Sequence, residues 1–349
     1  MRTSRIKIAD YWIGEDEPFI VAEAGINHNG EIKKALEMVQ VAKAAGAHAI
    51  KFQTYKADEI VASPSQLYTY KSQGKTVTEP MLDMFKRYEF SREQWLSIKK
   101  KCLETGIIFL STPQNRSDLD LLLELGVAAI KVGSDDFTNI PLLKDYATTG
   151  LPLLLSMGMA DLTEVKESLA AVGAMKKYPT VLLACTSEYP TPPEDANLLR
   201  LKTLSQMFPD ILLGFSDHTR GVTASCLAVA LGACIFEKHF TLDNNLPGPD
   251  HWFSENPSEL KEWIRSIQLS YTMLGSSVVQ PTEQEKINRN EFRRVIVASK
   301  KIQKGQSYTD DNLVAKRVAG GKGLSAKLIP NILGKKAPKD YEKNESVEI

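Results

Sequence analysis

The chain has 349 residues, of which 43% are hydrophobic and 25% are charged, proportions of a globular protein rather than of a disordered or collagen-like chain. The 43 basic residues balance the 43 acidic ones, so the basic surplus expected of a nucleic-acid-binding protein is absent. The four cysteines form no CxxC pair, which argues against a disulfide scaffold or a cysteine-based zinc site and favours a reducing, cytoplasmic compartment.

The N-terminal residues 1–18 carry charges throughout and contain no apolar run, so we expect no secretory signal. No later stretch approaches the ~18 uninterrupted apolar residues of a membrane helix, so we expect no membrane partner.

Short, continuously apolar runs alternate with helical patterns from residue 19 onwards. The predicted strands are 19–23, 48–53, 107–112, 128–133, 152–157, 180–186, 211–216 and 234–239. The predicted helices are 32–45, 92–105, 117–125, 161–172, 195–207, 222–231 and 257–274. Strands that are apolar on both faces are typical of a parallel sheet covered by helices. Eight such units predict a (β/α)8 TIM barrel over residues 1–275, with an open doubly wound sheet as the alternative.

Three segments depart from this alternation. Residues 56–90 show no clear period and lie between the second and third strands, where a long insertion often serves as a lid or substrate-binding loop. Residues 276–291 are predicted to form a polar linker. Residues 292–349, with short β-type runs and turn signals, are predicted to form a small β-rich domain, close to the lower size limit for independent folding.

Polar or charged residues lie at or just after the end of every predicted strand. In chain order these include Glu23, Lys51, Gln53, Thr112, Lys131, Ser134, Ser156, Tyr189, Ser216, His218, Glu237 and His239. The carboxyl ends of barrel strands form the active-site face of TIM barrels. A purely structural barrel would bury apolar residues there, because an unpaired buried charge is costly. The pattern therefore predicts an active site.

Two pairs within this group indicate specific chemistry. His218 and His239 end neighbouring strands, so their imidazoles could share a divalent ion that keeps positions open for substrate oxygens, although a hydrogen-bonded structural histidine is the usual alternative. Lys51 and Lys131 fit an anion pocket for a carboxylate and a phosphate. They could instead be structural lysines balanced by acidic neighbours, or Lys131 could form a Schiff base.

The motifs at these positions resemble those of bacterial sialic acid synthases. The matching segments are VAEAGINHNG (21–30), IKFQTYKAD (50–58), STP (111–113), IKVGS (130–134), SMGM (156–159), YPTP (189–192), GFSDHT (214–219), EKHFTLD (237–243) and GPDH (248–251). RRVIVASKKIQKGQ and DNLVAKR resemble the C-terminal antifreeze-like (SAF) domain of that family. The resemblance covers essentially the whole chain.

The resemblance implies an enzyme that condenses phosphoenolpyruvate (PEP) with an N-acylated hexosamine. The sugar would be N-acetylmannosamine or 2,4-diacetamido-2,4,6-trideoxymannose. The products would be a nonulosonic acid, either sialic or legionaminic acid, and the phosphate released by cleavage of the C–O bond of PEP.

The resemblance also implies a role for each site residue. His218 and His239 would bind a divalent metal, most often Mn²⁺, with Mg²⁺ and Co²⁺ as alternatives. PEP would contact Lys51, Thr112, Lys131, Ser134, Ser156, Tyr189 and Ser216. The sugar would face Glu23, Gln53 and Asp250, together with Arg317 from the SAF domain of the partner in a domain-swapped homodimer. Glu23, with Glu237 as the second candidate, would orient water or transfer a proton.

The chain departs from the family pattern at Met157, at Ser187 and over residues 318–321, which puts the contacts at those positions in doubt. Two other functions stay open at this point. One is a class I aldolase that holds pyruvate through a Schiff-base lysine, and the other is a non-catalytic carbohydrate- or ice-binding protein.

Overall fold

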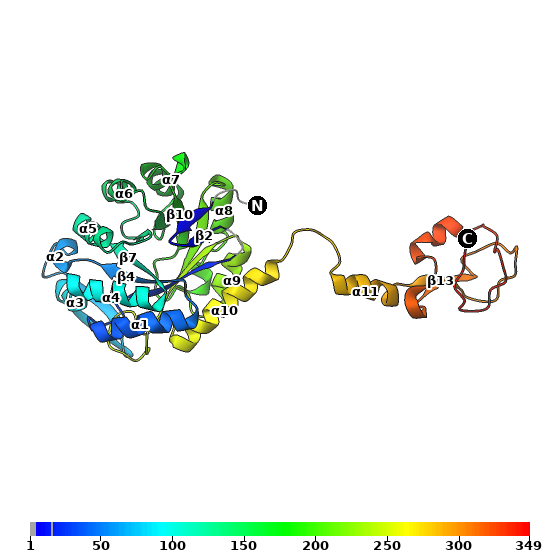
Figure 1. Ribbon diagram of the computed structural model, residues 1–349, viewed down its shortest axis with the longest axis horizontal. Helices are drawn as coiled ribbons and strands as arrows, with labels where there is room; N and C mark the ends of the chain where they lie inside the picture. The colour runs from blue at the N-terminus through cyan, green and yellow to red at the C-terminus, as the bar shows by residue number, and fades with distance from the viewer. Residues whose placement is uncertain (1–4, 15–16) are drawn as a thin grey trace. The chain divides into compact units, whose positions relative to one another are not determined.

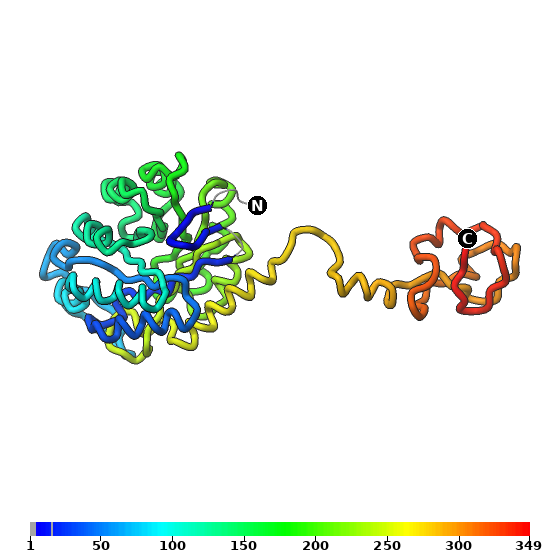
Figure 2. Tube along the Cα trace, in the orientation of Figure 1, coloured from blue at the N-terminus to red at the C-terminus, as the bar shows by residue number. Residues whose placement is uncertain are grey.

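The computed structural model describes residues 5–14 and 17–349. These described residues fall into two units, one that ends at Gly275 and one that spans Ser276–Ile349. The chain trace in Figure 2 follows both units from the N-terminus to the C-terminus.

The first unit is built on one parallel sheet of eight strands, ordered β7-β4-β3-β12-β11-β10-β9-β8. The strands are β3 (Phe19–Gly25), β4 (Ala49–Thr54), β7 (Ile108–Pro113), β8 (Ile130–Val132), β9 (Leu153–Ser156), β10 (Thr180–Cys185), β11 (Leu212–Asp217) and β12 (Ile235–His239). All eight predicted strands are confirmed. β7 and β8 lie side by side at the two ends of this order, and no ladder joins them in the described part of the chain, so the barrel is nearly closed. The predicted barrel is thereby confirmed, and the open doubly wound sheet is excluded.

Helices surround the sheet (Figure 1). They are α1 (Ile32–Ala45), α4 (Arg92–Thr105), α5 (Arg116–Glu124), α6 (Ile140–Ala147), α7 (Leu162–Ala171), α8 (Arg200–Met207), α9 (Thr223–Ala230) and α10 (Pro257–Leu274). Capping boxes at Ser91, Asp161 and Asn256 start three of them where the sequence places a polar residue before a helical pattern. In the described part of the chain, no helix is both long enough and apolar enough to cross a lipid bilayer.

A short N-terminal hairpin, which the sequence analysis did not predict, fills one end of the barrel. It pairs β1 (Ile6–Ile8) with β2 (Tyr11–Ile13) in antiparallel register. Ile6, Ile8 and Ile13 are buried in one apolar cluster with inward-facing strand residues such as Leu183. The amino-terminal end of the barrel is therefore apolar, and the polar strand ends gather at the opposite end.

The insertion between β4 and β7 is ordered. It contains α2 (Ala57–Ile60), the antiparallel strands β5 (Leu67–Ser72) and β6 (Lys75–Pro80), and α3 (Met81–Tyr88). Gln73 and Gly74, with φ values of 51° and 74°, form the two-residue turn of this hairpin. The aperiodic sequence concealed these elements because each of them is only four to eight residues long.

The second unit has a small core of its own, which includes Ile296, Tyr308 and Tyr341. Its elements are α11 (Glu283–Phe292), the antiparallel strands β13 (Val295–Ala298) and β14 (Leu313–Lys316), the 3-10 turns η3 (Ala319–Gly321) and η4 (Ala326–Leu328), and α12 (Ile329–Ile332). The predicted β-rich domain therefore contains a two-stranded sheet.

Within the segment 276–291, predicted as a polar linker, helix α11 begins at Glu283. Thr282 caps the helix by accepting a hydrogen bond from the N–H of Glu285. The helix packs against η3 so closely that a Cβ on Gly321 would lie 1.9 Å from the carbonyl oxygen of Asn290. The charged residues of 283–291 are thus the exposed surface of a helix that belongs to the second unit.

Candidate active site

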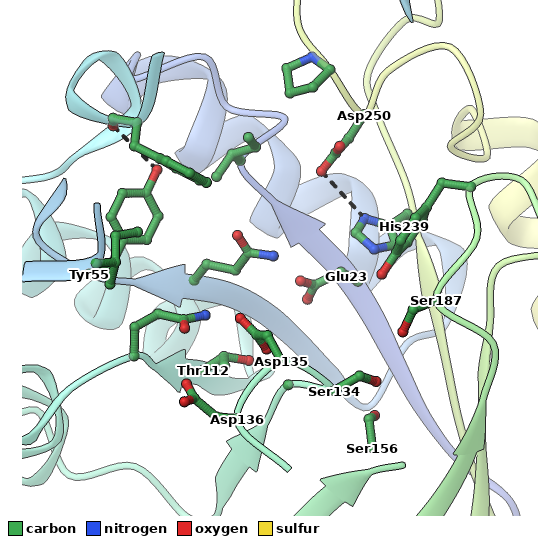
Figure 3. A pocket seen from close by; sticks show the side chains of 18 of the residues that line it. Glu23, Tyr55, Thr112, Ser134, Asp135, Asp136, Ser156, Ser187, His239 and Asp250 are labelled. Carbon is green, nitrogen blue, oxygen red and sulfur yellow. Dashed lines mark hydrogen bonds and ion pairs between the residues drawn. The ribbon is translucent and has the colours of Figure 1, made fainter. Parts of the chain in front are cut away.

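A cavity of about 1100 Å³ lies at the carboxyl ends of the barrel strands (Figure 3). The predicted site residues that line it are Glu23, Lys51, Gln53, Thr112, Lys131, Ser134, Ser156, Tyr189, Ser216, His218, Glu237, His239 and Asp250. These residues come from strands that are far apart in the sequence and from the loops that follow them, so closure of the barrel brings them together. The insertion 56–90 also contributes lining side chains, among them Ile60, Tyr68 and Met84.

Two lysines and two glutamates form a buried ion cluster at the base of this cavity. Lys51 Nζ lies 2.9 Å from Glu23 Oε1 and 3.8 Å from Glu237 Oε2. Lys131 Nζ lies 3.5 Å from Glu237 Oε1. All four side chains are buried. The cluster has no net charge when all four groups are ionised, so the two ammonium groups can be held out of water until an anionic ligand arrives.

Burial and charge shift the pKa values of this cluster in different directions. Burial raises the pKa of Glu23 to about 7, although the charge of Lys51 opposes the shift. Burial lowers the pKa of Lys131, opposed by the charge of Glu237. Burial also acts to lower the pKa of Lys51, but Glu23 and Glu237 outweigh it and raise that pKa. A carboxyl group with a pKa near neutrality is suited to proton transfer.

Hydroxyl groups surround the ion cluster, and two of them have no protein partner. Thr112 Oγ1 accepts a hydrogen bond from Lys51 Nζ at 3.1 Å, and Ser216 Oγ donates one to Glu237 Oε1 at 3.0 Å. The hydroxyls of Ser156 and Ser187 are buried without any hydrogen bond. Buried hydroxyls are normally paired, so these two indicate where a ligand would bind.

Gly158 makes room for this hydroxyl cluster. Its N–H donates to Ser134 Oγ at 3.0 Å. A Cβ at this position would lie 2.3 Å from Ser187 Oγ and 2.5 Å from Ser134 Oγ. Any larger residue at 158 would therefore displace the two serines from the cavity wall.

His218 and His239 lie beside each other at the cavity wall, with ring centroids 5.5 Å apart. His218 Nδ1 donates to the carbonyl oxygen of Thr186 at 2.7 Å, which leaves its Nε2 lone pair available. Nδ1 of His239 is buried without a hydrogen bond and lies 4.0 Å from Asp250 Oδ2, an approach marked by the dashed line in Figure 3. The ring of Tyr189 packs on His218 with centroids 4.1 Å apart.

These two imidazoles could hold a metal only if substrate or water supplied its other ligands. No group of three or more histidine, cysteine, aspartate or glutamate side chains arranged for a metal occurs among residues 5–14 and 17–349. A closed four-ligand structural site is therefore absent from the described residues. A Lewis-acid centre needs a coordination position that is open to substrate or water.

Two charged residues at the strand ends face away from the cavity. Lys238 Nζ lies 3.0 Å from Asp217 Oδ2 and 3.5 Å from Glu255 Oε1, and all three side chains are buried. Asp217 Oδ2 also accepts a hydrogen bond from Ser225 on α9 at 2.6 Å. Because strand side chains alternate in direction, these residues fix the strands that carry the two imidazoles instead of entering the site.

Sequence analysis missed several residues that line the cavity. The side-chain amide nitrogen of Gln114 donates to Asp135 Oδ2 at 3.2 Å and to Asp136 Oδ2 at 3.1 Å. The adjacent pair of aspartates directly after Gly133-Ser134 was a signal that could have revealed this corner. Tyr55 also lines the cavity, directly after β4. It was missed because the sequence analysis looked for charged or nucleophilic side chains at the strand ends, and a tyrosine is neither at neutral pH.

Two further positions bear on the sequence-based expectations. Met157, where the chain departs from the family pattern, is buried in the apolar core cluster, so the departure adds no polar group to the site. Arg317 directly follows β14 in the second unit, and its guanidinium lies 5.4 Å from the ring centroid of Phe292.

Comparisons with known proteins agree with this arrangement. Residues 38–279 match the NeuB family and residues 293–348 match the SAF domain. The N,N'-diacetyllegionaminic acid synthase of Legionella pneumophila is 39% identical over 321 residues, which cover 90% of this chain and 89% of that protein. The synthase of the same name from Campylobacter jejuni is 38% identical, with 94% and 98% covered.

A solved structure also supports a relation to sialic acid synthases. The N-acetylneuraminic acid synthetase of Leptospira borgpetersenii superposes with a TM-score of 0.74 at 35% identity, covering 83% of this chain and 97% of that chain. The family match spans most of the barrel, and the relatives align over nearly their whole length. The chain therefore belongs to the NeuB family and carries a C-terminal SAF domain.

Proposed function

We propose that this protein is a nonulosonic acid synthase, which joins PEP to the aldehyde carbon of an open-chain N-acylated hexosamine and releases phosphate. The observation that carries the proposal is the meeting of two buried lysines and two imidazoles in one cavity. The names of its relatives, which include legionaminic acid and sialic acid synthases, support this class of product.

The base of the cavity suits the two anionic groups of PEP. Lys51 and Lys131 supply positive charge for a carboxylate and a phosphate. The unpaired hydroxyls of Ser156 and Ser187 supply hydrogen-bond donors. Thr112, Ser134, Ser216 and Tyr189 complete the surroundings of PEP in this proposal.

The chemistry proceeds in three steps. Carbon 3 of PEP attacks the aldehyde carbon of the sugar, which forms the new C–C bond and leaves positive charge on carbon 2. Water adds to carbon 2, and the proton that it gives up passes to the former aldehyde oxygen, which becomes a hydroxyl group. The intermediate then breaks the bond between carbon 2 and the bridging oxygen, the proton of the carbon 2 hydroxyl passes to the departing phosphate, and an α-keto acid remains.

Named side chains act on these steps. Glu23 is the candidate to take the proton of the water, because its Oε2 is buried without a hydrogen bond and burial raises its pKa to about 7. Glu237 is the second candidate. The lysines stabilise the charge on the departing phosphate, an effect that is strong in a site without water.

A divalent metal, Mn²⁺ with Mg²⁺ and Co²⁺ as alternatives, would polarise the aldehyde oxygen when bound. His218 and His239 would hold it. The unpaired Nδ1 of His239 and the free Nε2 of His218 support this assignment. Gln53 and Asp250, which line the same cavity, would face the sugar.

Phosphate release from PEP in the presence of each candidate sugar tests the proposal. With ¹⁸O in the bridging oxygen of PEP, the released phosphate should carry the label, since the C–O bond breaks. Unlabelled phosphate would refute this mechanism. The class I aldolase alternative predicts that borohydride traps pyruvate on a lysine, whereas a PEP synthase should show no adduct.

We further propose that Arg317 reaches the acyl group of the sugar from the second unit of a partner chain, in a domain-swapped homodimer. Sedimentation should then give the mass of a dimer. An inactive R317A chain mixed with an inactive K131A chain should regain activity, because some sites combine two intact parts. If dimers that contain one chain of each variant form and no activity returns, the swapped arrangement is contradicted.

A further inference from the structure

We propose that His251 is a positioning residue, which fixes the loop 240–256 so that the carboxylate of Asp250 points into the cavity. The inference rests on the proposed function, in which Asp250 faces the acceptor. It assigns a role to a buried imidazole that does not itself line the cavity. The loop connects β12 to α10 and carries Asp250 directly before His251.

The carboxylate of Asp250 has little to hold it directly. It approaches Nδ1 of His239 at 4.0 Å, the dashed line in Figure 3, and this distance is longer than a hydrogen bond. Among the described residues, the structure shows no hydrogen bond to the carboxylate oxygens of Asp250. The direction of this carboxylate therefore depends on how firmly the backbone around residue 250 is held.

The imidazole of His251 is held at both ring nitrogens. Asn29 donates from Nδ2 to the carbonyl oxygen of Pro247 at 2.9 Å, so its Oδ1 accepts a hydrogen bond from Nε2 of His251, also at 2.9 Å. Nδ1 of His251 then accepts from the hydroxyl of Thr241 at 2.6 Å. Burial lowers the pKa of His251 to about 4, so the ring is neutral at pH 7, as these two bonds require. The ring thus joins the loop to the turn that follows β3.

Hydrogen bonds also hold the backbone on either side of Asp250. The N–H of Gly248 donates to the hydroxyl of Ser72, at the end of β5, at 3.0 Å. The carbonyl oxygen of Asp250 accepts from Ser254 Oγ at 2.7 Å, and that hydroxyl accepts from Nδ2 of the buried Asn27 at 2.9 Å. The loop is therefore tied to the insertion on one side and to the turn after β3 on the other.

The loop packs directly on the imidazole ring. A Cβ on Gly248 would lie only 2.8 Å from Cδ2 of His251, and the φ of 146° at Gly248 itself favours glycine. Asn244 donates from Nδ2 to the carbonyl oxygens of His251 and Ser254, at 3.0 and 2.6 Å. The shape of the imidazole and its two hydrogen bonds therefore determine where residues 248–251 lie. A shift of about 1 Å in a group that orients a substrate can lower a rate about a hundredfold.

A double-mutant cycle between H251M and D250A tests whether His251 acts through Asp250. Phosphate release from PEP is measured with N-acetylmannosamine or 2,4-diacetamido-2,4,6-trideoxymannose, whichever the wild type uses faster. H251M should lower kcat/KM for the sugar about tenfold to a hundredfold and leave KM for PEP within about twofold of the wild type. In the D250A background, H251M should cost less than about twofold more, because the group that it positions is already gone.

Three further variants serve as controls. H251Q keeps an amide that can donate to Asn29 and should retain more activity than H251M. H48M makes the same substitution directly before β4, at the opposite end of the barrel, where Nδ1 of His48 accepts from the N–H of Ile20 at 3.0 Å. It should leave kcat/KM for the sugar unchanged.

N29G removes the partner of His251 instead of the imidazole. The φ of 55° at Asn29 lies in the left-handed region, which glycine adopts without strain. N29G should lower kcat/KM for the sugar in the same direction as H251M, and it replaces H251M in the cycle with D250A if H251M does not fold.

The outcomes separate this inference from the proposed function. If H251M costs as much in the D250A background as in the wild type, or raises KM for PEP as much as KM for the sugar, the positioning role is overturned while the synthase function stands. A folded H251M protein with full activity overturns it as well. If the wild type releases no phosphate with either sugar, the proposed function fails and this inference fails with it.

Discussion

Replacing Lys131 by methionine should remove most of the catalytic rate without unfolding the barrel. Methionine keeps an unbranched side chain of similar length, so the buried volume at this position changes little. The variant loses the ammonium group that lies 3.5 Å from Glu237 Oε1. Glu237 then keeps its hydrogen bond from Ser216 and the weaker 3.8 Å approach of Lys51.

The expected loss of rate can be worked out if the ammonium group of Lys131 approaches the phosphate of PEP about as closely as it approaches Glu237. Two unit charges ~4 Å apart interact by about 4 kcal/mol at an effective dielectric constant near 20. Part of that energy also stabilises bound PEP, so we expect a loss of about 3 kcal/mol in the transition state, or a roughly hundredfold lower kcat. Phosphate release under saturating PEP measures this value.

Two controls sharpen the Lys131 experiment. K99M makes the same substitution on α4, where Lys99 donates to the carbonyl oxygen of Gly126, and should leave the rate unchanged. Adding E237Q to K131M removes the uncompensated carboxylate and should restore PEP affinity in part. A folded K131M protein with full activity would refute the anion-pocket assignment.

Three further results are expected. Dialysis against a chelator should abolish turnover, and added Mn²⁺ should restore it. Elemental analysis of purified H239A should find less than one metal ion per chain. Activity that survives complete removal of metal from the wild type would contradict a metal role. K238M, which leaves Asp217 buried without its cation, should lower the free energy of unfolding by about 3–5 kcal/mol in denaturant titrations; an unchanged midpoint would show that the pair is not structural. Burial and the charge of Glu59 raise the pKa of Asp118 to about 7, so the free energy of unfolding of the wild type should fall as pH rises from about 4 to 7. D118N should be more stable than the wild type by about 1–2 kcal/mol at pH 8, and this gain should shrink toward pH 4. An equal gain at both pH values would contradict the raised pKa.

The order of elements in the barrel could be predicted from the sequence. Its eight strands are apolar on both faces, and that pattern arises because helices cover one face and the barrel interior the other. The candidate site followed from the same order, because polar residues at the carboxyl ends of parallel strands converge wherever the sheet closes.

The direction of each side chain at those ends depended on the tertiary structure. Asp217 and Lys238 alternate with His218, Glu237 and His239, yet only closure of the barrel decides which set faces inward. Strands that are buried on both faces show no period-two pattern, so the sequence contains no local signal for this choice.

The sequence by itself therefore determined the fold class and the chemical groups available at one end of the barrel. The tertiary structure alone decided that insertion 56–90 forms a hairpin and contributes to the cavity wall, and that the helix over residues 283–292 belongs to the second unit. The short elements of the insertion are stabilised by packing rather than by their own propensity, so their contacts become evident only in the folded chain.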